Sequence, residues 1–381
     1  MKNERYVMIP GPTPVVEPIQ RSMGRKTAAF KDPEFVSDFE SVLADLKKLW
    51  RTDGEVFVVP GSGTLAMEMA VSNTLAPGEN VLIISHGYFG DRFVEIADRK
   101  NYEYKVLSSE WGTGIDPEKI REELKRKDYD GVIVTHVDTS TGVKAPIEEI
   151  GQIVKSESDA IYIVDGVCAT AAEEEYVDPM NIDILFTGSQ KAFGVPPGLA
   201  ILWASSKAME KREQLGNIRE YYGDFKKWLP IMHDPSNYFG TPAVNLIWAL
   251  QTSLKLIKEE GLESRFVRHK KDAEAIQTAL EAMGFDILAE DEWRAHTLSN
   301  VLYPEGIEDE EFRNILREEG AVVAGGLGEY AGKLFRLGHM GNIDEHVITS
   351  VLQAIERTLY RCGYNVKFGA GMKAYMKTKY K

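Results

Sequence analysis

Two polar residues near the ends of neighbouring apolar runs are the first candidates for chemistry. The run Ala160–Val164 is followed directly by Asp165, and the next run, Ile184–Thr187, is followed closely by Lys191. A lysine amine can form a Schiff base with a carbonyl compound. Enzymes that use pyridoxal 5′-phosphate (PLP) pair such a lysine with an aspartate that faces the ring nitrogen. A lysine alone is more often a solvated surface residue, so the interpretation depends on Asp165.

A glycine-rich turn follows an earlier apolar run and suits a phosphate. The segment Gly61-Ser-Gly-Thr64 lies between the strand candidate Val56–Val59 and a helix candidate. Glycine lets the backbone approach a ligand, and the free N–H groups at a helix start attract anions. Gly63 and Thr64 are the candidate phosphate ligands. Neither GxxxxGK[ST] nor GxGxxG is present, so an ordinary turn with Thr64 as the helix cap is equally consistent with the pattern.

Two further strand ends carry aromatic or hydroxyl groups. In His86-Gly-Tyr-Phe-Gly90, Phe89 could lie against a cofactor ring, although core packing is the commoner role of such aromatics. The stretch Thr135–Gly142 is rich in hydroxyls, which could hydrogen-bond a phenolic oxygen or form a plain turn. We assign no general-base role to His136, because no GxSxG motif accompanies it.

Composition and charge limit the classes of function. The chain has 381 residues and a net charge of −14, which argues against general nucleic-acid binding because phosphate neutralisation needs a basic face. The two cysteines, Cys168 and Cys362, form no CxxC pair, and no metal site is indicated. No signal peptide or membrane-spanning run is visible, so we expect a cytoplasmic protein.

The order of apolar runs predicts a doubly wound α/β domain with a mostly parallel sheet. Between about residues 55 and 205, continuous apolar runs alternate with amphipathic segments, as expected for strands covered on both faces. The strand candidates are Val56–Val59, Asn80–Ile84, Tyr104–Leu107, Gly131–Thr135, Ala160–Val164, Ile184–Thr187 and Leu199–Trp203. The helix candidates are Thr64–Leu75, Gly90–Arg99, Pro117–Arg126 and Pro146–Ser156.

The pattern changes after Pro242 and predicts a smaller α+β domain. Strand candidates there are Phe285–Leu288, Leu298–Tyr303, Ala321–Ala324 and Lys333–Leu337, and helix candidates are Val244–Gly261, Leu262–Met283, Asp309–Glu319 and Asp344–Cys362. We therefore divide the chain into an extended N-terminal segment (1–20) near the active site, a large domain (21–260) and a small domain (261–381). The lysine-rich stretch after Gly363 is expected to be a solvated, partly frayed tail.

Several of these motifs together resemble the class V aminotransferases, which are fold type I PLP enzymes, and in particular their alanine–glyoxylate/serine–pyruvate group. The resemblance runs from Ile9-Pro-Gly-Pro-Thr-Pro14 to the segment around Arg336. Its most specific motifs are Gly188-Ser-Gln-Lys-Ala192, Pro196-Pro-Gly198 and Val164-Asp-Gly-Val167. It implies a fold type I transferase that binds PLP.

The resemblance also implies roles for individual residues. Lys191 corresponds to the Schiff-base lysine and Asp165 to the partner of the ring nitrogen. Val167 would pack on one face of the ring and Phe89 on the other, where the family usually has a tryptophan; a phenylalanine lacks the indole N–H. Thr139 matches a hydroxyl near the ring. The implied phosphate ligands are Ser62, Gly63, Thr64 and Gln190.

The remaining implied roles concern substrate and partner. Tyr238 and Thr241 resemble residues that reach the cofactor phosphate of the neighbouring subunit, so a homodimer with shared active sites is expected. Arg336 resembles the arginine that binds the substrate carboxylate, a role suited to a forked guanidinium, and Gly11 falls among the substrate-binding residues.

The expected reaction is transfer of an amino group from alanine or serine to glyoxylate or pyruvate by a ping-pong mechanism. A 2-aminoethylphosphonate transaminase shares the fold and the chemistry and remains open. A cysteine desulfurase is disfavoured, because the region Ala321–Gly332 has no cysteine and Gln190 replaces the histidine that usually precedes the lysine in those enzymes. A PLP-fold protein that only binds is disfavoured while Lys191 and Asp165 are both present.

Overall fold

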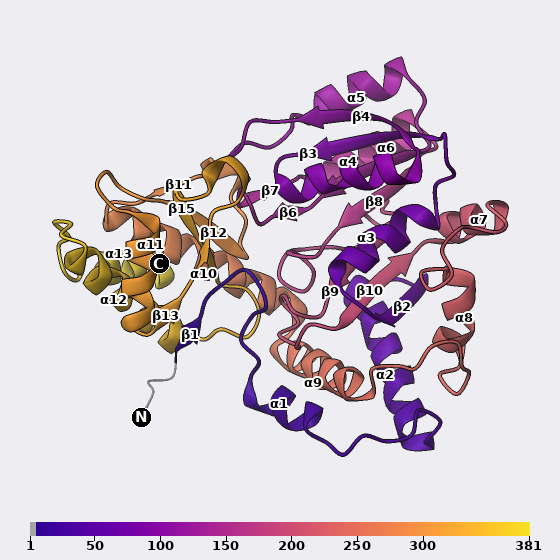
Figure 1. The fold of residues 1–381 in the computed structure, drawn as a ribbon, viewed down its shortest axis with the longest axis horizontal. Helices are drawn as coiled ribbons and strands as arrows, with labels where there is room; N and C mark the ends of the chain where they lie inside the picture. The colour runs from indigo at the N-terminus through magenta and orange to yellow at the C-terminus, as the bar shows by residue number, and fades with distance from the viewer. Residues whose placement is uncertain (1–4) are drawn as a thin grey trace.

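A computed structural model describes residues 5–381, and its largest element is a mixed seven-stranded sheet (Figure 1). From β4 to β9 all neighbouring strands are parallel, whereas β10 is antiparallel to both β9 and β2. The order across the sheet is β2 (Glu55–Pro60), β10 (Leu199–Ala204), β9 (Ile184–Gly188), β8 (Ile161–Asp165), β5 (Gly131–Thr135), β3 (Asn80–Ser85) and β4 (Glu103–Ser108).

Helices cover this sheet and confirm the predicted α/β architecture. The strands β5, β8, β9 and β10 are buried along their whole length, as their continuous apolar sequences require. The helices that pack on the sheet or on each other over it are α2 (Pro33–Trp50), α3 (Gly63–Ser72), α4 (Tyr88–Lys100), α5 (Pro117–Arg126), α6 (Ile147–Glu157) and α8 (Phe225–His233). The antiparallel direction of β10 was not predictable from its sequence, because a continuous apolar run reports burial and not direction.

A second, antiparallel sheet lies beside the first (Figure 1). Its order is β11 (Asp286–Ile287), β12 (Leu298–Leu302), β15 (Leu334–Gly338) and β14 (Ala324–Gly325). The helices α10 (Leu262–Ala282), α11 (Asp309–Glu318) and α12 (Glu345–Arg361) contribute most of the apolar side chains that cover it. The buried apolar residues form two clusters, one around each sheet.

The expectation of a frayed C-terminal tail is wrong. The chain forms the helix α13 (Ala370–Lys379), which packs on α10 and buries Tyr375 completely. Its first turn is anchored by Glu356, whose carboxylate oxygens accept hydrogen bonds from the backbone N–H of Gly369 and of Gly371, each at 2.9 Å. Near its end, Lys379 forms an ion pair with Asp272. The many lysines of this segment made it look fully solvated, although one face of the helix is apolar and packs on the fold.

The N-terminal segment connects the two sheets. β1 (Tyr6–Val7) pairs in parallel with β13 (Ala321–Val322), and the carbonyl of Met8 accepts a hydrogen bond from the N–H of Gly338 at 2.8 Å.

The other elements are α1 (Glu17–Met23), β6 (Val137–Asp138), β7 (Val143–Lys144), α7 (Ser206–Gln214), α9 (Val244–Glu260) and two short 3₁₀ turns, Asp291–Trp293 and Gly328–Tyr330. In the described part of the chain, no helix has the length and apolar character needed to cross a membrane.

Candidate active site

Asp165 and Lys191 lie at the same end of adjacent parallel strands. Asp165 is the last residue of β8 and pairs in register with Phe186 of β9, whose end at Gly188 is soon followed by Lys191. Asp165 is buried, and its Oδ1 accepts a hydrogen bond from the N–H of Val167 at 2.9 Å. Burial raises the pKa of Asp165 to about 7, opposed by that hydrogen bond and by the charge of Lys191. Among residues 5–381 no ion pair includes Asp165, and Lys191 is the cation whose charge lowers its pKa.

The N-terminal segment holds the side chain of Lys191. Its Nζ donates a hydrogen bond to the carbonyl of Pro10, and the hydroxyl of Thr13 donates to the carbonyl of Lys191 at 2.7 Å. Gly11 has φ +124°, and a Cβ there would lie 2.6 Å from Cδ of Lys191. Only glycine fits this position, both because of its backbone conformation and because of the lysine beside it. Gly11, which the resemblance places with the substrate ligands, thus contacts the lysine itself.

The N-terminus of α3 faces the loop that follows Asp165. A Cβ on Gly63, the first residue of α3, would lie 3.1 Å from Cγ2 of Val167. The cap residue is Ser62 rather than Thr64, and its side chain makes no capping hydrogen bond. Among residues 5–381, Oε1 of Gln190 is buried without a hydrogen-bond partner. The free backbone N–H donors at this helix start fit an anionic ligand, and Gln190 could donate to such a ligand only through its amide nitrogen, Nε2.

Asp138, which was not among the residues predicted for the site, fixes the position of Phe89. Phe89 is half-buried in the first turn of α4. The backbone N–H groups of Phe89 and Gly90 donate to Oδ2 of Asp138 at 2.8 and 3.1 Å. The other oxygen, Oδ1, accepts from the N–H and the hydroxyl of Ser140 at 2.9 and 2.6 Å. The turn Asp138–Ser140 was recognisable locally as a hydrogen-bonding turn, but its contact with another helix depends on the tertiary fold.

The four-stranded sheet brings Arg336 toward the turn that contains Thr139. Arg336 pairs in register with Asn300, whose Nδ2 donates to the carbonyls of Thr139 and Ser140 at 3.4 and 2.5 Å. Arg336 Nε donates to the carbonyl of Gly325 at 2.7 Å. Burial lowers the pKa of Arg336, and the charge of Asp138 partly opposes this. No ion pair found between residues 5 and 381 includes Arg336. This guanidinium is therefore free to donate hydrogen bonds to a substrate carboxylate.

Cys168 is a buried thiol close enough to Lys191 and Arg336 for their charges to interact with it. Burial raises its pKa, while the charge of Lys191 lowers it. A thiol with a raised pKa stays protonated and is a weak nucleophile. The other cysteine, Cys362, follows α12. Neither cysteine has the surroundings of a nucleophile, which agrees with the case made from sequence against a desulfurase.

Tyr238 and Thr241 stand apart from the other candidates within one chain. Tyr238 is 60% exposed, and its ring packs on Phe30 with the ring centres 5.2 Å apart. Its hydroxyl lies 3.5 Å from the hydroxyl of the exposed Thr241. In the described residues, no hydrogen bond or aromatic contact joins this pair to Asp165 or Lys191.

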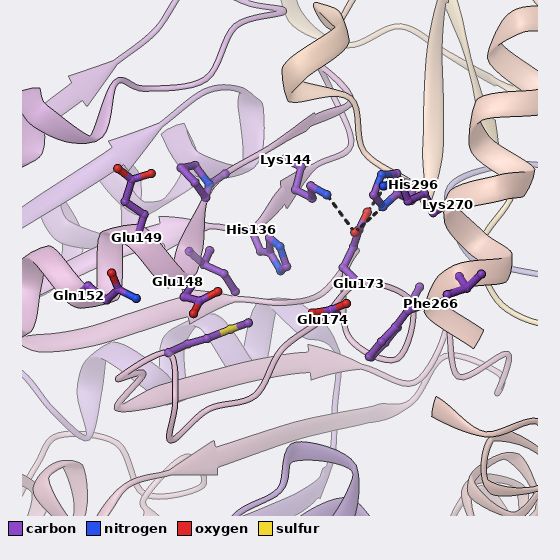
Figure 2. Close-up of a pocket in the computed structure, with 16 residues that line it drawn as sticks. His136, Lys144, Glu148, Glu149, Gln152, Glu173, Glu174, Phe266, Lys270 and His296 are labelled. Carbon is purple, nitrogen blue, oxygen red and sulfur yellow. Dashed lines mark hydrogen bonds and ion pairs between the residues drawn. The ribbon is translucent and has the colours of Figure 1, made fainter. Parts of the chain in front are cut away.

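A cavity of about 700 Å³ lies beside His136 and is lined by several charged residues. Figure 2 shows Glu173 between Lys144 and His296, with the ring of His136 nearby. Glu173 Oε2 lies 2.9 Å from Nδ1 of His296 and 3.3 Å from Nζ of Lys144. His136 Nδ1 lies 2.8 Å from Oε1 of the buried Glu175. The carboxylate of Glu175 therefore engages the ring of His136.

Comparison with known proteins identifies the family. The model of the family "Aminotransferase class-V" matches residues 27–334. The chain is 40% identical over 366 residues to an uncharacterized aminotransferase of Methanocaldococcus jannaschii, covering 96% of this chain and 95% of the relative. It is 34% identical over 374 residues to a serine–glyoxylate aminotransferase of Hyphomicrobium methylovorum, covering 96% of this chain and 92% of the relative.

The solved structures agree. The crystal structure of the ureidoglycine–glyoxylate aminotransferase from Bacillus subtilis superposes with a TM-score of 0.94 at 29% identity, over 100% of this chain and 99% of that one. Both sheets and the N-terminal segment fall within this match. The chain therefore belongs to the class V aminotransferases and is a transaminase with the fold type I architecture.

Proposed function

We propose that this transaminase uses PLP to move the amino group of a small L-amino acid, alanine or serine, to glyoxylate or pyruvate in a ping-pong reaction. The observation that carries the proposal is the buried Asp165, which belongs to no ion pair among the described residues and lies at the same sheet edge as Lys191. The names of the relatives from Hyphomicrobium methylovorum and Bacillus subtilis support glyoxylate as an acceptor. The acceptor is thus better supported than the amino donor.

The residues present fit PLP at each of its functional parts. Ser62, Gly63 and Thr64 are assigned to the phosphate because they form the uncapped start of α3, and Gln190 is assigned to it through its amide N–H donors, as the resemblance implies. Asp165 is assigned to the ring nitrogen, Val167 and Phe89 to the two ring faces, and Thr139 to the phenolic oxygen. When bound, PLP supplies an electron sink for the pair released at the substrate α-carbon.

The chain's own groups then divide the remaining tasks. Lys191 Nζ would take the proton released at the substrate α-carbon and deliver it to the C4′ carbon of the cofactor, and the carbonyl of Pro10, which accepts a hydrogen bond from this amine, would orient it. Asp165 keeps a proton on the ring nitrogen that faces it. Arg336 binds the substrate carboxylate through its guanidinium, which has no acidic partner in the described chain.

The test is a spectrum followed by a substrate panel. Purified protein given PLP should show a near-visible absorbance band that Lys191→Ala abolishes. Donors (alanine, serine, aspartate and 2-aminoethylphosphonate) are then paired with glyoxylate, pyruvate and 2-oxoglutarate. Turnover of alanine or serine with glyoxylate or pyruvate supports the proposal. A protein that takes up no PLP contradicts it, as does a clear preference for 2-aminoethylphosphonate or sulfide release from cysteine.

We further propose that the protein works in the cytoplasm as a homodimer, in which Tyr238 and Thr241 of one subunit reach the phosphate in the other. Their exposure, and the absence of a hydrogen bond between them and Asp165 or Lys191 in the described residues, support this arrangement. Mixing and refolding Lys191→Ala with a Tyr238→Ala/Thr241→Ala variant should restore activity, because each hybrid dimer contains one intact site. A fully active monomer, or no gain on mixing, would contradict shared sites.

A further inference from the structure

Arg92 connects two parts of the site that the family resemblance treats separately. It lies in α4 one turn beyond Phe89, and its guanidinium carbon is 4.8 Å from the centre of the Phe89 ring. Its Nη1 donates a hydrogen bond to the hydroxyl of Thr64 in the first turn of α3, at 3.3 Å. One cation therefore touches both the aromatic ring assigned to the cofactor face and a hydroxyl assigned to the phosphate.

The charge of Arg92 is not neutralised by an acid in the described part of the chain. No ion pair there includes Arg92, although two acidic residues lie close to it on α4. Asp91 accepts a hydrogen bond from the hydroxyl of Ser85 at 2.7 Å, and Glu95 pairs with Arg99 at 2.7 Å. Both acids are thus engaged elsewhere. A half-buried guanidinium beside an uncapped helix start adds positive charge where backbone N–H groups already favour an anion.

We propose that Arg92 binds the phosphate group of the cofactor and orders the Phe89 ring beside it. The inference rests on the proposed use of PLP and adds a ligand to that site. A guanidinium suits both contacts, because its face stacks on an aromatic ring while its edge presents several N–H donors, of which Thr64 takes one. The arrangement also supplies a polar N–H group next to Phe89, whose ring has none.

The test separates the phosphate from the rest of the cofactor by comparing PLP with pyridoxal, which lacks the phosphate. Dissociation constants are measured from the near-visible band for the wild type, Arg92→Gln, Arg92→Lys and Arg99→Gln. Arg99 is the matched control, since it lies on the same helix and is paired with Glu95. Arg92→Gln should weaken PLP binding roughly 10- to 100-fold and pyridoxal binding less than about threefold. Arg92→Lys should fall between Arg92→Gln and the wild type, and Arg99→Gln should match the wild type.

A second readout uses inorganic phosphate and no cofactor. Phosphate should raise the melting temperature of the PLP-free wild type and of Arg99→Gln more than that of Arg92→Gln. Equal PLP affinities in the wild type and Arg92→Gln, or an equal loss of PLP and pyridoxal affinity, would overturn the assignment. A wild-type protein that binds no PLP would instead defeat the proposed function, so the two failures are distinguishable.

Discussion

The Lys191 site and the cavity of Figure 2 differ in the partners of their buried charged groups. The two regions meet at His136. Its backbone N–H donates a hydrogen bond to the carbonyl of Asp165 at 2.9 Å, and its ring lines the cavity. In the cavity, Glu173 has His296 and Lys144 as partners. In the site, Asp165 accepts from a backbone N–H, and Arg336 donates to a backbone carbonyl.

This difference, and not the presence of a cavity, indicates the active site. Isolated charges are costly to bury, so a folded chain either pairs them or keeps them for a ligand that supplies the partner. At the cavity, the buried Glu173 and Glu175 have nitrogen partners, whereas the lining residues Glu148, Glu149, Glu174 and Lys270 form no ion pair among residues 5–381. In the Lys191 site, neither Asp165 nor Arg336 belongs to an ion pair within the same described residues, which is the pattern expected where a ligand completes the structure.

The largest expected effect is on turnover and compares one acid from each region. Asp165→Asn should lower kcat roughly 10²- to 10³-fold, because a neutral amide cannot keep a proton on the facing ring nitrogen. Glu173→Gln should leave kcat within about threefold, since that carboxylate serves the fold. Both are measured with serine and glyoxylate at saturating PLP. Near-wild-type turnover in Asp165→Asn would remove this residue from the reaction.

The next effect is on the free energy of unfolding. Its pH dependence should have opposite signs for Asp165 and Glu173. In the fold without cofactor, the pKa of Asp165 is about 7 against an ordinary 3.8, so the folded state binds more protons and stability falls as pH rises from 4 to 7. Three pKa units correspond to about 4 kcal/mol. Asp165→Asn should therefore unfold at higher urea concentration than the wild type above pH 7, by up to that free energy, and show no gain at pH 4.

Glu173 should show the reverse behaviour. Its pKa is about 2 in the fold against 4.5 ordinarily, because hydrogen bonding to His296 and the charge of Lys144 outweigh burial. This stability is fully present above pH 4.5 and is lost as pH falls toward 2. Glu173→Gln should cost up to about 3 kcal/mol at pH 7, with the difference shrinking in acid. Parallel pH profiles for the two variants would mean that the regions do not differ in charge pairing.

A smaller effect is expected for substrate binding. Arg336→Gln should raise KM for the amino donor roughly 10- to 100-fold while leaving the PLP band intact, because it removes a charged contact to the substrate and not to the cofactor. Arg313 is a suitable control, since it already forms an ion pair with Asp309 at 2.5 Å. Steady-state kinetics of both variants decide the point. An unchanged KM in Arg336→Gln would place the carboxylate elsewhere.

The smallest effect should come from Lys144, the partly exposed cation of the cavity. Lys144→Met should lower stability by less than about 1 kcal/mol, because His296 still pairs with Glu173 and solvent screens the lost charge. Turnover should not change. Urea unfolding and kcat measure the two quantities, and a large loss of turnover would give the cavity a part in catalysis that its charge pairing does not suggest.

Local sequence was sufficient to predict the elements that carry the chemistry. The strands that end near Asp165 and Lys191 are continuous apolar runs with clear ends, and their positions match β8 and β9 to within a residue or two. The helix α2 was not among the predicted elements, even though Asp32 caps it and Pro33 opens it. Attention to caps would have found this helix.

The contacts that refine the site could not be predicted from sequence. Asp138 caps a helix that begins far from it along the chain, and Arg92 reaches Thr64 only because the starts of α3 and α4 are neighbours. Such contacts depend on strand order, which apolar patterning does not encode. The same limit explains why the direction of β10 and the packing of α13 were missed.

The N-terminal segment also affects how the protein can be made. Tyr6 and Val7 pair with Ala321 and Val322, and this pairing helps to hold Pro10 and Gly11 at Lys191. Ribosomes add roughly 5–20 residues per second, so the first strand must wait on the order of tens of seconds for its partner to be synthesised. A nascent chain that already contains Lys191 and Asp165 still lacks the strand pairing that helps to hold the carbonyl of Pro10 against the lysine amine. Activity should therefore appear late in synthesis, after the second sheet has formed.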